Sequence, residues 1–106
     1  MDNNIWEKII NDLKNNPRDL QTIPINNRIG KWFYAEIKGE VITLKKSQNK
    51  KPSSKFINNH YLKKEDFDLI YPIYIRRKAG EKVSNESKIS FNRVYIYSIL
   101  YNCGKV

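Results

Sequence analysis

The stretch that decides the fold is KWFYAEIKGEVITLKK, residues 31–46. Apolar and polar residues alternate on both sides of a central glycine, which is typical of a β-hairpin with one buried face. A two-residue turn at Lys38–Gly39 would set Phe33 opposite Leu44. One face of the hairpin is then apolar and predicted to be core, while the other is mixed. The core face consists of Phe33, Ala35, Ile37, Ile42 and Leu44, and the mixed face of Trp32, Tyr34, Glu36, Val41, Thr43 and Lys45.

A helix and a short extended segment precede the hairpin. Apolar residues recur one helical turn apart and predict a helix over residues 4–15. That helix should end there, because the residue before Pro17 is driven out of the helical region. Residues 20–25 are predicted to be extended and to lie at a sheet edge, since Pro24 lacks a backbone donor.

A short strand and two helices are predicted after the hairpin. The strand is Phe56–Ile57. The first helix covers residues 62–79, and Pro72 favours a kink or break within it. The second helix covers residues 90–103, although its Tyr95–Tyr97 run is also compatible with a strand. Together the elements predict an α+β fold, in which a small antiparallel sheet packs against an N-terminal helix and two C-terminal helices.

Length, charge and cysteine content narrow the class of protein. A chain of 106 residues predicts a single domain over residues 1–106 with one modest core. The net charge of +9 favours a polyanionic partner, either nucleic acid or an acidic protein surface; the alternative is a basic, soluble surface with no such partner. The single Cys103 excludes an internal disulfide and suits a cytoplasmic location. One histidine and one cysteine do not supply the ligands of a zinc site, so neither a metal nor a cofactor is expected. No apolar run approaches the roughly 20 residues of a membrane span.

Two basic segments are candidates for contact with phosphate. Residues 45–55 contain five lysines and no apolar side chain, which predicts a mobile basic loop. Residues 76–78 are also basic, although cations there could simply complement the helix dipole. If the mixed hairpin face is exposed, Trp32 and Tyr34 would stack on unpaired bases; the alternative is that the N-terminal helix covers this face. The candidate nucleic-acid-binding residues are Trp32, Tyr34, Lys45, Lys46, Lys50, Lys51, Lys55, Arg76, Arg77 and Lys78.

The hairpin also contains a Glu-x-Lys pair of the kind that metal-dependent nucleases use. Glu36 and Lys38, with Asp19 one strand earlier, would hold Mg²⁺ and orient the attacking water. Such a pair arises often by chance in a chain in which 29% of residues are charged, and the predicted turn sets it at the exposed hairpin tip. His60 has no nucleophile in register and is predicted to lie in a surface loop. We therefore expect no enzymatic activity.

The order of the elements resembles a known family. The segments concerned are KWFYAEIKGEVITL, YLKKEDFDLIYPIY and FNRVYIYSIL, and the resemblance covers about residues 4–102. The chain is similar to a small α+β domain that is associated with mobile genetic elements and restriction-type gene neighbourhoods. This resemblance implies a domain that binds nucleic acid or a partner protein. Its motifs are apolar patterns, and none is catalytic.

Two functional hypotheses follow. The first is an accessory protein of a mobile element that binds nucleic acid without strong sequence specificity, through the lysine-rich hairpin and loop. The alternative is an accessory or inhibitor protein that docks on an acidic surface of a host protein. The tyrosines of the two C-terminal helices favour this alternative, because they are more than one small core needs. We expect one or two of them at a surface or at the interface of a homodimer.

Overall fold

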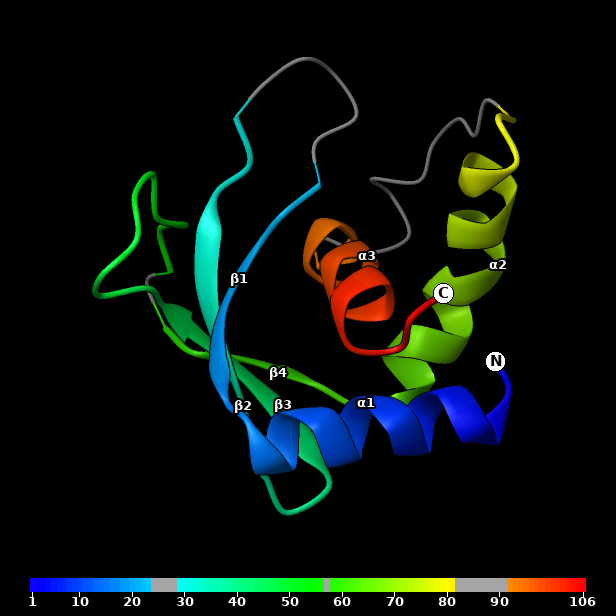
Figure 1. The fold of residues 1–106 in the computed structure, drawn as a ribbon, viewed down its shortest axis with the longest axis horizontal. Coiled ribbons are helices and arrows are strands. Elements are labelled where there is room, and N and C mark those ends of the chain that lie inside the picture. The colour runs from blue at the N-terminus through cyan, green and yellow to red at the C-terminus, as the bar shows by residue number, and fades with distance from the viewer. Residues whose placement is uncertain (24–28, 57, 82–91) are drawn as a thin grey trace.

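Four antiparallel strands and three helices form the described part of the computed structural model, residues 1–23, 29–56, 58–81 and 92–106. The elements in chain order are α1 (Asn3–Asn15), β1 (Arg18–Gln21), β2 (Trp32–Lys38), β3 (Val41–Lys46), β4 (His60–Leu62), α2 (Lys64–Lys78) and α3 (Arg93–Asn102). The strand order is β1-β2-β3-β4, so each strand pairs with the next one along the chain. All three helices lie on one side of this sheet (Figure 1). The predicted α+β class is confirmed, with four strands in the described residues instead of three.

The hairpin β2–β3 has the two faces that its alternating pattern predicts. Four side chains of its core face are fully buried: Phe33, Ala35, Ile42 and Leu44. The predicted register is wrong by two residues, because Ile37 lies opposite Ile42 and not opposite Glu40. The turn is formed by Gly39 and Glu40, and Gly39 adopts a φ of 64°, which favours glycine. A shift of two residues keeps every side chain on its original face, so the predicted faces survive the error.

The two outer strands differ from their predicted positions. β1 begins at Arg18 rather than at residue 20 and forms one edge of the sheet; residues 24 and 25 lie outside the described residues. β4 is formed by His60–Leu62; of the predicted strand Phe56–Ile57, Phe56 lies in no strand and Ile57 lies outside the described residues. Leu62 is fully buried as the last residue of β4, although its spacing predicts the start of the following helix.

An aromatic cluster explains why Phe56 does not belong to a strand. The Phe56 ring lies 4.7 Å from the His60 ring and 5.2 Å from the Tyr95 ring, measured between centroids. His60 is half-buried, and its Nδ1 lies 2.8 Å from Oδ1 of Asn92. The prediction that His60 lies in a surface loop is therefore wrong, since the residue joins β4 to the beginning of α3.

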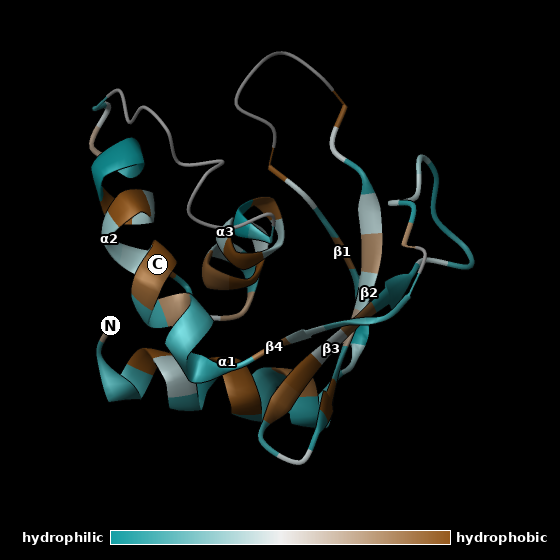
Figure 2. Ribbon diagram, turned by 180° about the vertical axis from the view of Figure 1, so that it is seen from behind, coloured by the Kyte–Doolittle hydropathy of each residue, from teal (hydrophilic) through white to brown (hydrophobic). Residues whose placement is uncertain are grey.

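The core lies between the sheet and the helices, and apolar stretches of all three helices take part in it (Figure 2). The fully buried helical side chains are Ile9 and Leu13 of α1, Phe67 and Ile70 of α2, and Ile96, Ile99 and Leu100 of α3. α1 begins after Asp2, whose Oδ1 accepts a hydrogen bond of 2.7 Å from the N–H of Asn4. Within the described residues, no helix is long and apolar enough to cross a membrane.

α2 runs through Pro72 without a break, so of the predicted kink or break the break is wrong. The proline ring is exposed, whereas Ile70, Ile73 and Tyr74 beside it are buried and hold both halves of the helix against the core. The free energy gained by core packing thus offsets the loss of the backbone hydrogen bond that a proline cannot donate. The strand alternative for Tyr95–Tyr97 is also wrong, because these residues lie in α3. The predicted N-terminal residue of that helix, Ser90, lies outside the described residues.

α3 covers the free edge of β1. Ser98 is fully buried, and its hydroxyl donates a hydrogen bond of 2.7 Å to the carbonyl of Gln21. Asn102 donates from its side chain to the Ser98 carbonyl at 2.9 Å. The helix therefore occupies an edge carbonyl that would otherwise accept a hydrogen bond from another strand.

Arg18 connects α1, β1 and the end of α3. Its Nη1 and Nη2 donate to the two carboxylate oxygens of Asp12 at 3.0 Å each, and Nη2 lies 3.8 Å from Sγ of Cys103. The hydrogen bond from Arg18 lowers the pKa of Asp12 below its ordinary value, and burial raises the pKa of Cys103 to about 12. The Cys103 thiol is therefore neutral and a poor nucleophile near neutral pH.

The Asp12–Arg18 pair predicts a pH-dependent part of the stability. Asp12→Asn is expected to lower the free energy of unfolding by about 1 kcal/mol at neutral pH. Because the pKa of Asp12 is lower in the folded state, its contribution is present above the ordinary value of 3.8 and is lost as the pH falls through the folded-state value. Urea denaturation of both proteins at neutral pH and near pH 3 measures this. A difference that persists unchanged in acid would contradict the role of the carboxylate.

Candidate nucleic-acid interface

Three rows of side chains cross the sheet on the face that points away from the helices, here called the open face. Residues in a row lie directly opposite one another on neighbouring strands. The rows are Gln21 with Trp32, Asp19 with Tyr34 and Lys45, and Glu36 with Thr43 and Tyr61. Successive residues of a strand point to opposite faces, so these side chains point away from the core. The open face thus combines three aromatic rings with charged and amide groups.

Trp32 and Tyr34 lie on the open face and are half-buried. α1 does not cover them, because its Ile9 and Leu13 enter the core on the other side of the sheet. The Trp6 ring of α1 instead packs against Phe67 of α2, with 5.3 Å between the ring centroids. The alternative that the N-terminal helix covers the mixed hairpin face is therefore wrong.

Tyr61 is a third aromatic residue of the open face, and the sequence did not identify it as a site residue. Its side chain is 58% exposed. It stands beside Thr43, which is fully buried although no described helix packs on this face. Its position depends on strand β4, whose place in the sequence was predicted wrongly, so no local signal distinguished it from other tyrosines.

Lys45 is held on the open face by an ion pair. Its Nζ lies 2.6 Å from Oε1 of Glu36, and Nζ of Lys38 lies 3.8 Å from the same oxygen. The hydrogen bond to Glu36 raises the pKa of Lys45 above its ordinary value. Lys45 belongs to β3, in agreement with its predicted place on the mixed hairpin face, and Lys46 also belongs to β3, so the predicted basic loop begins after Lys46 and not at Lys45. The Glu-x-Lys pair is thus part of a charge cluster with Lys45.

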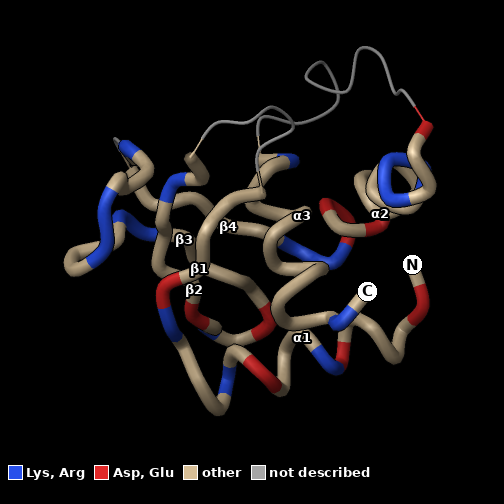
Figure 3. The backbone as a smooth tube through the Cα atoms, turned by 45° about the horizontal axis from the view of Figure 1, so that its top comes forward, with Lys and Arg blue, Asp and Glu red and all other residues tan. Residues whose placement is uncertain are grey.

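The loop that follows β3, residues 47–55, is here called the lysine loop. Backbone hydrogen bonds connect it to the beginning of β2. The N–H of Trp32 donates to the carbonyl of Pro52, and the N–H of Ser54 donates to the carbonyl of Trp32, both at 2.8 Å. Nζ of Lys50 lies 5.4 Å from the centre of the Trp32 ring. The loop therefore brings its cations next to the open face, as the blue segments beyond β3 show in Figure 3.

The remaining cations of this region are available to a ligand. Lys46, Lys51 and Lys55 are exposed, and within the described part of the chain none of them forms an ion pair. An exposed ammonium group on a flexible side chain suits contact with phosphate better than contact with a particular base. The structure thus places the cations of the lysine loop next to the hairpin.

The other predicted basic residues lie elsewhere. Arg76, Arg77 and Lys78 form the last turn of α2, on the helical side of the molecule (Figure 3). Arg76 pairs with Glu81 at 3.2 Å, and the guanidinium of Arg77 lies 6.0 Å from the centre of the Tyr97 ring. The structure therefore divides the predicted site residues into two groups that do not form one surface.

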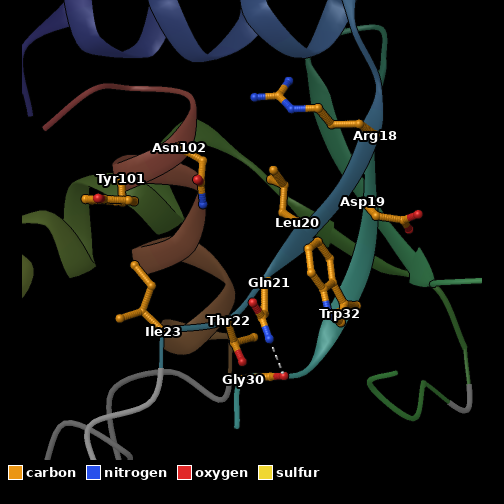
Figure 4. Close-up of a pocket in the computed structure, with 10 residues that line it drawn as sticks. All are labelled: Arg18, Asp19, Leu20, Gln21, Thr22, Ile23, Gly30, Trp32, Tyr101 and Asn102. Atoms are coloured by element: carbon orange, nitrogen blue, oxygen red, sulfur yellow. Dashed lines mark hydrogen bonds between the residues drawn. The ribbon is translucent and has the colours of Figure 1, made fainter. Parts of the chain in front are cut away.

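A cleft of about 440 Å³ lies between the open face and the lysine loop. It is called the open-face cleft, and its lining residues are Asp19, Tyr34, Lys45, Lys46, Gln48, Asn49 and Asn59. Sequence reasoning missed its three amide side chains, because nothing in their spacing shows that the loop turns back toward β1. A second cleft of about 520 Å³ runs along the edge of β1, beside Tyr101 and Asn102 (Figure 4).

The residues proposed for a nuclease site are partly engaged with one another. Asp19 and Glu36 share the open face on neighbouring strands, and Glu36 is occupied by Lys45 and Lys38. Over the described ranges of the chain, no group of three or more His, Cys, Asp or Glu residues could hold a metal ion. The expectation of no enzymatic activity stays a prediction.

Comparison with known proteins adds no relative. No family model, no curated protein and no solved structure matches the chain. The resemblance to a mobile-element domain therefore stays a prediction.

Proposed function

We propose that this protein binds single-stranded nucleic acid on its open face without strong sequence specificity, as a non-enzymatic accessory protein of a mobile element. One observation carries the proposal. All described helices pack on one side of the sheet, and the uncovered side carries Trp32, Tyr34 and Tyr61 next to the lysine loop. Flat rings on an uncovered sheet, bordered by cations, are the arrangement that stacks unpaired bases and neutralises their phosphates.

The aromatic residues account for the preference for single-stranded over double-stranded nucleic acid. Bases in a duplex are stacked on one another and cannot reach the rings, whereas unpaired bases can be splayed out. Each base stacked on an aromatic side chain contributes about 1–3 kcal/mol. Nζ of Lys50 lies 5.4 Å from the centre of the Trp32 ring, a cation–π contact that supports binding of a cationic or flat partner on the loop side of this ring.

The lysines supply the part that does not depend on sequence. Phosphate contacts position a strand without identifying its bases, and their strength falls steeply as salt is raised. Lys46, Lys50, Lys51 and Lys55 lie on the end of β3 and the lysine loop, so a strand stacked on the open face would have its backbone next to them. Weak sequence preference is expected from such an arrangement.

Fluorescence anisotropy with labelled single- and double-stranded oligonucleotides, at low and at moderate salt, tests the proposal. We expect the single strand to bind at micromolar protein and near 50 mM salt, more tightly than the duplex. Trp32→Ala combined with Tyr34→Ala should weaken single-strand binding about tenfold and change duplex binding little. Absence of binding at low salt, or equal loss for both ligands, would overturn stacking on the open face.

A second candidate function is docking on an acidic protein surface. It is favoured by Tyr101, which is 56% exposed and borders the cleft along β1 together with the exposed Ile23. Exposed tyrosines with apolar neighbours often anchor protein interfaces. Failure of every oligonucleotide to bind in the experiment above would favour this function.

A further inference from the structure

One carboxylate oxygen of Asp19 has no hydrogen-bond partner among the residues that the structure describes. This oxygen, Oδ1, is buried. Oε1 of Glu36, the other carboxylate of the open face, is likewise buried, but it lies 2.6 Å from Nζ of Lys45 and 3.8 Å from Nζ of Lys38, so this carboxylate has cationic partners. A buried carboxylate oxygen without a donor is costly, so a ligand that turns the carboxylate toward itself and supplies a donor would remove that cost.

The surroundings of Asp19 are those of a site for a flat polar group. The residue lies directly opposite Tyr34 and diagonally from Trp32 on the neighbouring strand. Its carboxylate points away from α3 and Asn102 in Figure 4. Asp19 and Tyr34 line the open-face cleft together with the amides of Gln48, Asn49 and Asn59. Its volume of about 440 Å³ falls within the usual range for small-molecule sites.

We infer that the open-face cleft is a subsite for one base of the bound strand, and that Asp19 makes it prefer guanine. This inference rests on the proposed function and adds a preference at a single nucleotide. Tyr34 provides the stacking surface, Asp19 accepts hydrogen bonds from the base edge, and Lys46 is near enough to the cleft to contact the phosphate of that nucleotide.

The preference for guanine follows from donor geometry. An ionised carboxylate only accepts hydrogen bonds and accepts two in parallel. Guanine has two donors side by side on its Watson–Crick edge, the ring N1–H and the exocyclic amino group, whereas adenine and cytosine have one amino group beside an acceptor. A carboxylate near phosphate would be repelled, so Asp19 has to face a base while the lysines face the backbone.

A set of labelled thymidine oligonucleotides, about a dozen nucleotides long with one variable central base, tests the subsite by anisotropy. Wild-type protein is expected to bind the central guanine about tenfold more tightly than thymine. Hypoxanthine in that position, which lacks only the amino group, should bind about threefold less tightly than guanine. Asp19→Asn should reduce the guanine preference to less than about twofold and leave affinity for the all-thymidine strand unchanged or raised.

Glu36→Gln is the matched control. It also removes one carboxylate from the open face, but Glu36 does not line the cleft. This variant is expected to bind every oligonucleotide more tightly, because Lys45 and Lys38 are released, and to keep the guanine preference. A wild-type protein without guanine preference, or a preference that survives Asp19→Asn, would overturn the subsite while leaving the proposed function intact.

Competition with free nucleotides tests whether the subsite binds a free guanine nucleotide or only a guanine within a strand. Displacement of the labelled strand by millimolar GMP but not AMP would support a subsite that takes a free nucleotide as well. Guanine preference in the strand without displacement by GMP would support a subsite that needs the flanking phosphates. If neither GMP nor any oligonucleotide binds, both the subsite and the proposed function are overturned, so the two failures are distinguishable.

Discussion

Replacing Phe33 by alanine is expected to lower the free energy of unfolding by about 3–5 kcal/mol. The ring is fully buried in the middle of the sheet and meets Tyr95 edge-on, with 5.0 Å between the ring centroids. Removing it leaves a cavity between the sheet and α3 and takes away an aromatic contact. A loss of this size is a large part of the roughly 5–15 kcal/mol that stabilises an ordinary domain.

Denaturation with urea, followed by circular dichroism, measures this loss. The neighbouring Trp32→Ala is the control, because Trp32 is half-buried on the open face, and we expect it to cost only about 1 kcal/mol. If the Phe33→Ala protein does not fold, Phe33→Leu replaces it in the measurement. We expect Phe33→Leu to lower the free energy of unfolding by about 1 kcal/mol. Equal losses for Phe33→Ala and Trp32→Ala would contradict the assignment of the two hairpin faces.

Replacing Lys45, Lys46, Lys50 and Lys51 by alanine is expected to weaken nucleic-acid binding by about two orders of magnitude at moderate salt. If each lysine meets a phosphate, the slope of log affinity against log salt should become shallower by roughly 3 for a single strand. The slope is the more informative quantity, because it counts the ions displaced and is insensitive to loss of stacking. Anisotropy titrations at four or more salt concentrations measure it.

The matched control removes the same charge from the helical side of the molecule. Lys8 and Lys14 of α1, Lys78 of α2 and Lys105 after α3 are exposed and lie off the open face. Their replacement by alanine should weaken binding only slightly, through the lower net charge, and leave the slope nearly unchanged. Equal effects of the two variants would show that binding is not confined to the hairpin and the lysine loop.

The hairpin faces were predictable from the sequence, because side-chain alternation has a period of two and Phe33, Ala35 and Leu44 obey it. The register was not, because two-residue turns at Lys38–Gly39 and at Gly39–Glu40 both use the same glycine. Moving the turn by one residue changes the pairing by two, which leaves the faces unaltered. Local pattern thus determined which side chains are buried but not which ones are neighbours across the strands.

Other errors came from tertiary packing that no local window contains. Phe56 was predicted to be part of a strand, but its ring packs against the rings of His60 and Tyr95. Pro72 looked like a helix breaker, yet its exposed position and buried neighbours let α2 continue. In both places the competing effect is burial of apolar surface, which outweighs a local preference of a few kcal/mol at most.

The sequence identified the lysines of the candidate site and its two aromatic residues Trp32 and Tyr34, but not whether these rings are exposed. Exposure of Trp32 and Tyr34 depends on where α1 packs, and that is decided by contacts such as Trp6 with Phe67, far apart in the sequence. Asp19 was considered only as a metal ligand, because its position opposite Tyr34 requires β1 to begin at Arg18. The amides of the open-face cleft carry no pattern of their own and become visible only when the lysine loop is in place.

The hydrogen bond between Ser98 and Gln21 has a consequence for how the chain folds. The strands of the sheet pair in sequence order, so their loops close at little entropic cost and the sheet should assemble early. The Ser98 contact spans 77 residues, and α3 leaves the ribosome after all four strands. Until it arrives, β1 presents an unpaired edge to other chains. We therefore expect docking of α3 to be the closing step of folding, and the interval before it to be the period of greatest exposure to aggregation.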